Sequence, residues 1–381
     1  MIVLTKDLAS IIHTTAKLIK HPKLSLDAFS QIAFVVKNNN LYVIGLGLSV
    51  PNSKVSSLYL LTTNVNMEDN VYFFKDKDIE KVFGTLGDET NLEFTETHLN
   101  LSSDNNGLMT HVNILRQKPY SPETEQTILN KLDELLNNPT NGENVIDTDD
   151  LIKKLNNLLK FKSAEKQVLT FEPNRVSVQQ HSYVAQEPFN FGFTARLGSD
   201  EVKVLIQAMS AISNGILEYN EHTGVLRYMS SISYFEITNV KNETYNLDKF
   251  EYTEGNHVTI QRTQLASALN LISNYVDNYS NMFIVVEDNQ LVLTTTINKD
   301  KVKNLSVPVI KLPITDRGSK VENRDYGLSL STLKTIVSIF EEPTINLYFE
   351  YHELETSLVY IATSETTNFM LLETFESVGD Y

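Results

Sequence analysis

The sequence contains no cysteine and no tryptophan among its 381 residues. Without cysteine, disulfide bonds, thiolate metal ligands and cysteine nucleophiles are all excluded. No stretch reaches the roughly 18 uninterrupted apolar residues that a membrane-spanning helix needs. The N-terminus also lacks the charged and then apolar pattern of a signal peptide. We therefore expect a cytoplasmic protein with no membrane partner.

Residues that would carry catalysis or bind metal are also missing. The eight histidines include no pair at ligand spacing, and no serine stands in a nucleophile-elbow context. Residues 45–53 begin like a dinucleotide-binding loop, but Val50 replaces the third glycine and strand pattern follows. The acidic run 147–150 stands where a helix needs its cap, which favours capping over a metal site. We expect a protein that is not an enzyme and needs no cofactor or metal.

Charge is strongly one-sided, with a formal net charge of −16. Such a charge normally argues against nucleic-acid binding, because Lys and Arg make the contacts to phosphate. Net charge does not say where the positive residues lie, however, so their distribution matters more. The length suggests two or three domains, and the apolar fraction of 41% is sufficient for their cores.

One order of elements recurs along the chain. The stretch LTKDLASII at 4–12 is echoed by QRTQLASAL at 261–269. Each belongs to a short strand, an amphipathic helix and two or three alternating strands, which is a β-α-β-β-β unit. Six copies of this order can be traced, and the strand FNFGFTA is expected to open the fourth. The expected helices are 7–20, 77–86, 148–161, 199–213, 263–276 and 331–341.

Two segments fall outside the repeat. Residues 121–138 carry a capping serine, a proline at the first helical position and early acids, which predicts an extra helix between two domains. The polar run 241–256 lacks a sustained period and predicts a second boundary. The fold class is therefore α+β with paired units. The predicted boundaries are 1–118 for the first domain, 119–142 for the helical linker, 143–247 for the second domain and 248–381 for the third.

Three tandem domains of doubled β-α-β-β-β units resemble the bacterial-type DNA sliding clamp, the beta subunit of replicative DNA polymerase. The local matches are 215–237, 257–273, and 326–349 together with the terminal NFMLLETF. The chain departs from the family in three ways. It has the extra helix, it lacks an Asp-Gly-His-Arg-like turn where SSISYF stands, and it continues with ESVGDY. These departures indicate a divergent member and suggest a phage source.

The resemblance implies a head-to-tail homodimer that forms a ring, with helices lining the hole and sheets outside. Such a ring encircles duplex DNA without sequence preference and tethers a polymerase without being an enzyme. In the family, polymerase and clamp loader bind through short peptide motifs in a hydrophobic pocket between the middle and last domains. The corresponding positions are Tyr234, Phe235, Leu247, Met370, Leu371 and Leu372.

A DNA-lined hole requires basic or neutral helix faces despite the acidic total. Acids on the expected helices cluster in the first turn, where they complement the helix dipole, and the other acids fall largely in strands, turns and linkers. The cations expected on the polar faces, and thus the candidate DNA contacts, are Lys6, His13, Lys17, Lys20, Lys77, Lys81, Lys153, Lys154, Lys160, Lys203, Arg262 and Lys334. The neutral residues expected on the same faces are Ser10, Asn157, Gln207, Ser210, Asn214, Ser267, Asn270, Asn274 and Ser338.

Other interpretations stay open at this point. Lysine is common on helix surfaces that bind nothing. A structural repeat protein, such as a virion or tail component, would show no charge difference between helices and strands. A clamp-derived protein of phage late transcription would share the same surface chemistry, and an unrecognised hydrolase would need catalytic groups that the sequence does not show.

Overall fold

The structure is a computed structural model, and it divides into two units by the contacts within the chain. Unit 1 comprises 1–152 and 195–243, and unit 2 comprises 153–194 and 244–381. The three predicted domains stay a prediction. The residues described are 1–19, 31–50, 53–75, 78–79, 81–82, 86–119, 122–137, 145–161, 167–180, 183–211, 215–230, 233–238, 240–241, 255–275, 281–295, 308–321, 325–352, 356–362 and 375–376.

Unit 1 contains two antiparallel sheets. One has seven strands in the order β13-β14-β15-β4-β3-β2-β5, and the other has four in the order β1-β6-β7-β8. Its elements are β1 (Ile2–Leu4), α1 (Thr5–Ile19), β2 (Gln31–Lys37), β3 (Asn40–Val50), β4 (Ser53–Thr63), β5 (Asn70–Lys75), β6 (Glu89–Phe94), β7 (His98–Asn105), β8 (Leu108–Leu115), α3 (Pro122–Asn137), the start of α4 (Thr148–Leu159), β12 (Ala195–Gly198), α5 (Ser199–Ala211), β13 (Ile216–Asn220), β14 (Val225–Met229) and β15 (Ser233–Ile237).

Unit 2 also consists of antiparallel sheets and helices. The described sheets include β20-β16-β22-β23-β24 and β19-β18-β17-β21, and β9, β10 and β11 pair as antiparallel neighbours. Its elements, besides the end of α4, are β9 (Val168–Glu172), β10 (Arg175–Gln180), β11 (Tyr183–Pro188), β16 (His257–Gln261), α6 (Arg262–Ile272), β17 (Asn281–Glu287), β18 (Gln290–Thr294), β19 (Val309–Pro313), β20 (Asp316–Arg317), β21 (Asp325–Ser329), α8 (Leu330–Ile339), β22 (Thr344–His352), β23 (Thr356–Ala362) and β24 (Phe375–Glu376).

The strand that opens a repeat joins the sheet of its neighbour. In unit 1, β1 pairs with β6 of the second copy, while β5 pairs with β2 of the first. In unit 2, β16 pairs with β22 and β21 pairs with β17. Two copies therefore form one folding module by exchanging their first strands, as a doubled unit requires.

Tight turns with left-handed backbone close two of the hairpins. Asn38 and Asn39 join β2 to β3 at φ 51° and 59°, and Asn106 and Gly107 join β7 to β8 at φ 54° and 87°. Asparagine and glycine accept this conformation most easily, and such turns match the right-handed twist of the strands. The local sequence thus fixes the register of both hairpins.

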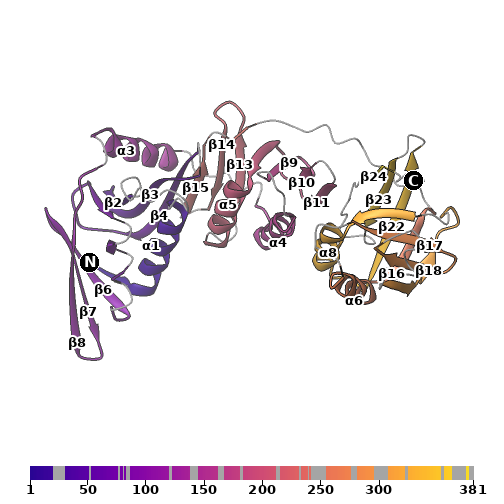
Figure 1. The fold of residues 1–381 in the computed structure, drawn as a ribbon. Helices are drawn as coiled ribbons and strands as arrows, with labels where there is room; N and C mark the ends of the chain where they lie inside the picture. The colour runs from indigo at the N-terminus through magenta and orange to yellow at the C-terminus, as the bar shows by residue number, and fades with distance from the viewer. Residues whose placement is uncertain are drawn as a thin grey trace. The chain divides into compact units, whose positions relative to one another are not determined.

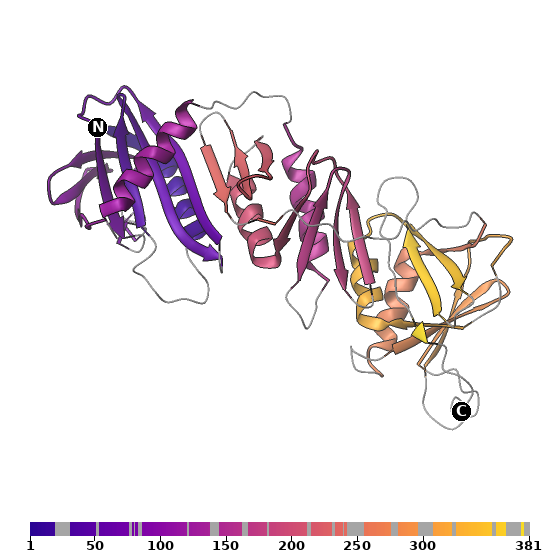
Figure 2. The ribbon, with the colours of Figure 1, turned by 90° about the horizontal axis from the view of Figure 1, so that it is seen from above.

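The seven-stranded sheet is apolar on both faces. On β2, Phe34 and Val36 pack in one core cluster with α1, while Ala33 and Val35 pack in another with Ile128 of α3. This alternation follows from the two-residue period of a strand. Figure 1 shows α1 and α3 on opposite faces of the sheet, and Figure 2 shows α3 lying across the strands. The extra helix was predicted correctly, and its role is to cover a sheet.

Among the described residues, the predicted element order is confirmed in four copies, the first, fourth, fifth and sixth, which contain α1, α5, α6 and α8. In the second copy, the structure describes helical conformation only at 78–79 of the expected helix 77–86. In the third, the expected strand before α4 is reduced to a single bridge, Val145 to Ile216. The α+β class is confirmed.

The prediction of a strand at residues 189–195, FNFGFTA, is wrong. The strand that opens the fourth copy is β12, which begins only at Ala195. Gly192 has φ 71°, which breaks extended backbone. Phe191 instead packs edge-to-face against Phe171, with ring centroids 5.0 Å apart, and also contacts the rings of Phe189 and Phe193, so these aromatic residues form a cluster in unit 2.

Candidate nucleic-acid interface

The exposed side of α1 carries a polar and basic stripe. Lys6, Ser10, His13 and Lys17 are exposed, whereas Leu8 is buried. The helical period of 3.6 residues places these four polar positions on one side of α1. The predicted exposure of this stripe is confirmed, and its contact with DNA stays a prediction.

A second stripe lies on α5 in the same unit. Lys203, Gln207 and Ser210 are exposed, as predicted. Asp200 in the first turn lies 3.4 Å from the Lys203 ammonium. The two helices contact each other, and Figure 1 shows both on the same side of the seven-stranded sheet. The stripes of α1 and α5 therefore belong to one surface of unit 1.

The lysines of α4 differ from one another in their surroundings. Lys153 and Lys160 are exposed. Lys154 is partly buried, donates to the Pro188 carbonyl oxygen at 2.9 Å and lies 5.5 Å from the Phe189 ring centroid. Of the three, Lys154 is thus the partly buried one, and its ammonium contacts a backbone oxygen and an aromatic ring.

Asn157 was predicted on the polar face of α4, and this is wrong. Its side chain is 7% exposed and donates to the Glu187 carboxylate at 3.2 Å. Lys160 in turn donates to the Asn157 side-chain oxygen at 3.2 Å. A buried carboxylate needs hydrogen-bond donors, and Asn157 supplies one.

Arg262 and Lys334 both lie in unit 2 and are partly buried. The Arg262 Nε donates to the Glu342 carbonyl oxygen at 3.0 Å, and Lys334 on α8 donates to the Ser273 hydroxyl after α6 at 3.2 Å. The helices α6 and α8 contact each other. Of the neutral positions predicted on the helix 263–276, Ser267 and Asn270 on α6 and Asn274 in the turn after it are exposed.

Three candidate cations from two helices meet around one carboxylate in unit 2. The Lys153 ammonium lies 2.8 Å from Glu341, which follows the end of α8. The hydrogen bond from Lys153 and the charges of Lys153, Arg262 and Lys160 lower the pKa of Glu341. We call Lys153, Lys160, Arg262 and Glu341 the Glu341 cluster. Sequence spacing could not reveal it, because its members are far apart along the chain.

Two candidate cations, Lys20 and Lys77, lie outside the described residues, and Lys81 is exposed in a turn. The predicted peptide pocket is described only in part. Tyr234 is 4% exposed and Phe235 is 0% exposed, so both belong to the interior of unit 1. The Tyr234 hydroxyl bonds to the Glu236 carboxylate. The remaining pocket positions, Leu247, Met370, Leu371 and Leu372, lie outside the described residues.

The acidic run before α4 caps that helix. The Asp150 amide donates to the Asp147 carboxylate at 3.1 Å, and the Leu151 amide donates to the Asp147 carbonyl oxygen at 3.0 Å. Capping was the predicted role. In the described part of the chain, no three His, Asp or Glu side chains are grouped so as to hold a metal ion. Among the described helices, none has the length and apolar character needed to cross a bilayer.

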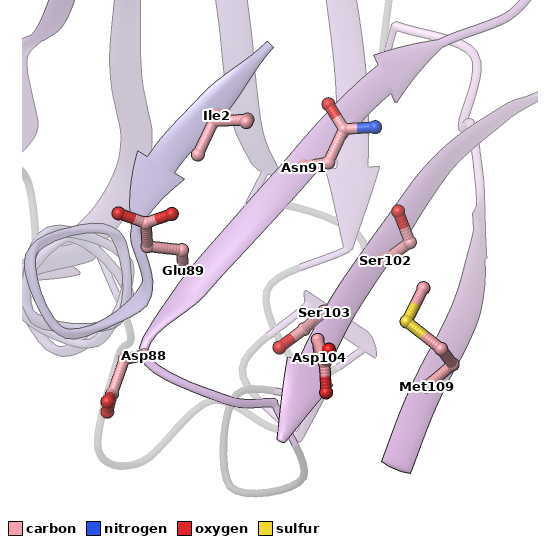
Figure 3. A pocket seen from close by; sticks show the side chains of 8 residues that line it. All are labelled: Ile2, Asp88, Glu89, Asn91, Ser102, Ser103, Asp104 and Met109. Carbon is pink, nitrogen blue, oxygen red and sulfur yellow. The ribbon is translucent and has the colours of Figure 1, made fainter. Parts of the chain in front are cut away.

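An acidic hollow of about 530 Å³ lies on the outer face of the four-stranded sheet. Figure 3 shows it spanning the strands from Ile2 to Met109. Asp88, Glu89 and Asp104 line it, and the described lining residues include no Lys or Arg. Acids thus gather on a sheet face of unit 1, whereas the stripes of α1 and α5 are basic or neutral.

Two sets of exposed apolar residues were not predicted from the sequence. The first set, named here the β8 patch, consists of Leu108 and Met109 at the start of β8 and Leu115 at its end, which are 68%, 58% and 56% exposed. Strand alternation places Leu108 on one face of β8 and Met109 and Leu115 on the other. The second set, named the α6–β19 patch, consists of Leu271, Tyr275 and Val309, which are 54%, 61% and 43% exposed and lie on α6, in the turn after it and on β19; α6 and β19 contact each other. Among the described strands, β8 and β19 each end a sheet. Helical spacing could have flagged Leu271, which stands beside the polar Asn270.

Solved structures of sliding clamps share the fold over nearly the whole chain. The beta subunit of DNA polymerase from Streptococcus pyogenes aligns at 12% identity with a TM-score of 0.69. The DNA polymerase sliding clamp from Pseudomonas aeruginosa aligns at 10% identity with a TM-score of 0.71. The DNA polymerase III beta subunit from Thermotoga maritima aligns at 12% identity with a TM-score of 0.69. Each alignment covers 99% of both chains.

Identity of 10 to 12% shows a shared fold, and the chain therefore has the fold of the beta clamp. No family model matches the sequence, and a sequence search of curated proteins finds no match. The proteins named above are bacterial, and they give no support to the suggested phage source.

Proposed function

We propose that the protein is a DNA sliding clamp, a ring that encircles duplex DNA and tethers a replicative polymerase without being an enzyme. The observation that carries the proposal is the basic and polar stripe of α1 beside that of α5, on a chain with the clamp fold. A protein that works on chromosomal DNA would act in the cytoplasm.

The distribution of charge supports this function over a structural repeat protein. A virion or tail component has no need for basic helix faces, whereas a lumen around DNA does. Exposed Lys6, Lys17 and Lys203 lie on helices, while Asp88 and Asp104 lie at an outer sheet face. A few exposed cations attract phosphate without fixing position or sequence. The protein would then be retained on DNA by the closed ring and not by the strength of its phosphate contacts.

The two apolar patches support head-to-tail closure of the ring. The β8 patch is in unit 1 and the α6–β19 patch is in unit 2, so two copies can pair one patch with the other. Each patch adjoins an edge strand, whose free backbone groups can extend a sheet across the boundary. A two-fold repetition of this contact closes the assembly.

The ring would contain six domains, three from each copy, with boundaries at 1–118, 143–247 and 248–381 and the α3 segment at 119–142 between the first two. Polymerase and clamp loader would bind through short peptide motifs. Because Tyr234 and Phe235 are buried, the exposed lining of the peptide pocket would have to come from Leu247, Met370, Leu371 and Leu372.

Charge reversal on the two stripes tests the proposal. The variant carries Lys17→Glu and Lys203→Glu, and its control carries Lys75→Glu and Lys320→Glu, exposed residues of a strand end and a turn. Both change the net charge equally. We expect retention on circular DNA to fall several-fold in the first variant alone, with the dimer intact by sedimentation. Equal retention of the two variants would rule out the helix faces as the DNA-facing surface.

A further inference from the structure

The Glu341 cluster places an acid among cations that are candidates for phosphate contact. Lys153 lies on α4, Lys160 follows the last residue of that helix seven positions later, and Arg262 begins α6. Lys153 reaches Glu341 at 2.8 Å, although the two residues are 188 positions apart in the chain. The side chains of Lys153 and Glu341 are 55% and 72% exposed, so the pair is open to solvent and ligand.

The backbone holds Glu341 in this place. The Arg262 amide donates to the Pro343 carbonyl oxygen at 2.8 Å, and its Nε donates to the Glu342 carbonyl oxygen at 3.0 Å. The backbone amide of Glu341 is also restrained, because it donates a hydrogen bond to the Glu342 carboxylate at 3.2 Å. The segment after α8 is therefore fastened to the start of α6 beside the cations.

A carboxylate and a phosphate use the same donors of a lysine ammonium. While Glu341 accepts from Lys153, that ammonium is partly neutralised and less available to DNA. The pair is exposed, and exposed ion pairs are weak, so a phosphate can displace the carboxylate. The carboxylate also repels phosphate from Lys160 and Arg262.

We propose that Glu341 competes with DNA phosphate for the Lys153 ammonium and so keeps the binding of Lys153 to the duplex weak and reversible. This inference rests on the proposed clamp function and concerns what sets the affinity of the DNA-facing surface. A clamp must hold DNA without stopping on it, and a competing carboxylate lowers the cost of moving Lys153 from one phosphate to the next.

Four proteins test the inference: wild type, Glu341→Gln, Lys153→Gln and the double variant. Their affinity for a short linear duplex is measured by fluorescence anisotropy from low to high salt. We expect Glu341→Gln to bind about three- to ten-fold more tightly at 0.1 M salt and to steepen the salt dependence by about 0.9 per protomer, the effect of one added phosphate contact.

The dependence of the Lys153→Gln effect on the residue at position 341 distinguishes competition for the ammonium from a purely structural role of Glu341. Lys153→Gln should weaken binding about two-fold in the wild-type background and about eight-fold in the Glu341→Gln background, since one freed contact is worth about that much at 0.1 M salt. Glu125→Gln removes the same charge from an exposed position on α3 and serves as the control. It should leave affinity within two-fold.

Additive effects of the two substitutions, or an affinity of Glu341→Gln equal to that of Glu125→Gln, would overturn the inference. If the wild-type protein is nevertheless retained on circular DNA, only the inference about Glu341 fails, and the proposed clamp function is unaffected. Wild-type protein that binds neither the short duplex nor circular DNA would overturn both.

Discussion

An exposed ammonium can reach DNA phosphate, whereas a partly buried ammonium that donates to neighbouring protein oxygens is held away from it. Lys17 is exposed on α1, whereas Lys154 and Lys334 are partly buried and donate to oxygens of Pro188 and Ser273. All three were assigned to DNA from their helical spacing. The structure separates them, because spacing locates a side chain on a face but does not show what the next element offers it.

Acid pH tests the electrostatic state of the Lys153–Glu341 pair. The hydrogen bond from Lys153 and the neighbouring positive charges lower the pKa of Glu341 from its ordinary 4.5. A lowered folded-state pKa stabilises the fold above the unfolded pKa, and this contribution disappears as the pH falls through the folded value. Wild type should therefore be more stable than Glu341→Gln at pH 7, and the difference should vanish below the lowered pKa.

Urea unfolding of both proteins between pH 7 and pH 3 measures this difference. A stability difference that stays constant over the whole range would mean that the ionised carboxylate plays no part.

At the scale of elements, α3 is the feature that sets this chain apart from a plain doubled repeat. Ile128 and Leu132 are 1% and 0% exposed and pack on Val35 and Ile44 of the seven-stranded sheet. Lys37 forms an ion pair with Asp133 on the same helix. The helix thus covers the face opposite α1, which would otherwise expose a large apolar surface.

Truncation of Leu132 measures what this cover contributes. Leu132→Ala should lower the free energy of unfolding by about 2–5 kcal/mol, because a buried methyl cluster is lost and a cavity remains. Glu125→Ala, at an exposed position of the same helix, should change it by less than about 0.5 kcal/mol. If chemical denaturation finds the two variants equally stable, α3 is not part of the core.

The two apolar patches predict an interface that joins different surfaces. Leu108→Lys in the β8 patch and Leu271→Lys in the α6–β19 patch should each give monomers, because each change damages both contacts of a two-copy ring. A mixture of the two variants should recover a dimer, since one contact then joins two intact patches. Leu4→Lys is the matched control, because Leu4 and Leu271 are both 54% exposed.

Analytical ultracentrifugation distinguishes these states. A mixture that stays monomeric would exclude a head-to-tail interface built from these patches, and a monomeric Leu4→Lys protein would show that the effect is not specific to them.

Over the whole molecule, sequence periodicity predicted the α+β class, the positions of α1, α3, α4, α5, α6 and α8, and the exposed face of α1. It failed where a residue's partner lies far along the chain. Asn157 has the spacing of a surface residue, yet it serves the buried carboxylate of Glu187. FNFGFTA has the alternation of a strand, yet the left-handed backbone at Gly192 interrupts the extended conformation, and Phe191 packs against Phe171. The exposed Leu108 and Met109 carry no local signal that distinguishes an interface from a core.

Release on linearisation tests most directly whether the protein holds DNA by encircling it. The protein is assembled on circular duplex DNA, separated from free protein by gel filtration in moderate salt, and the DNA is then cut at one site. The account predicts that the protein stays on the circle and leaves within minutes of cutting, because nothing but the closed ring retained it. Equal retention on circular and cut DNA, or no retention on either, would contradict it.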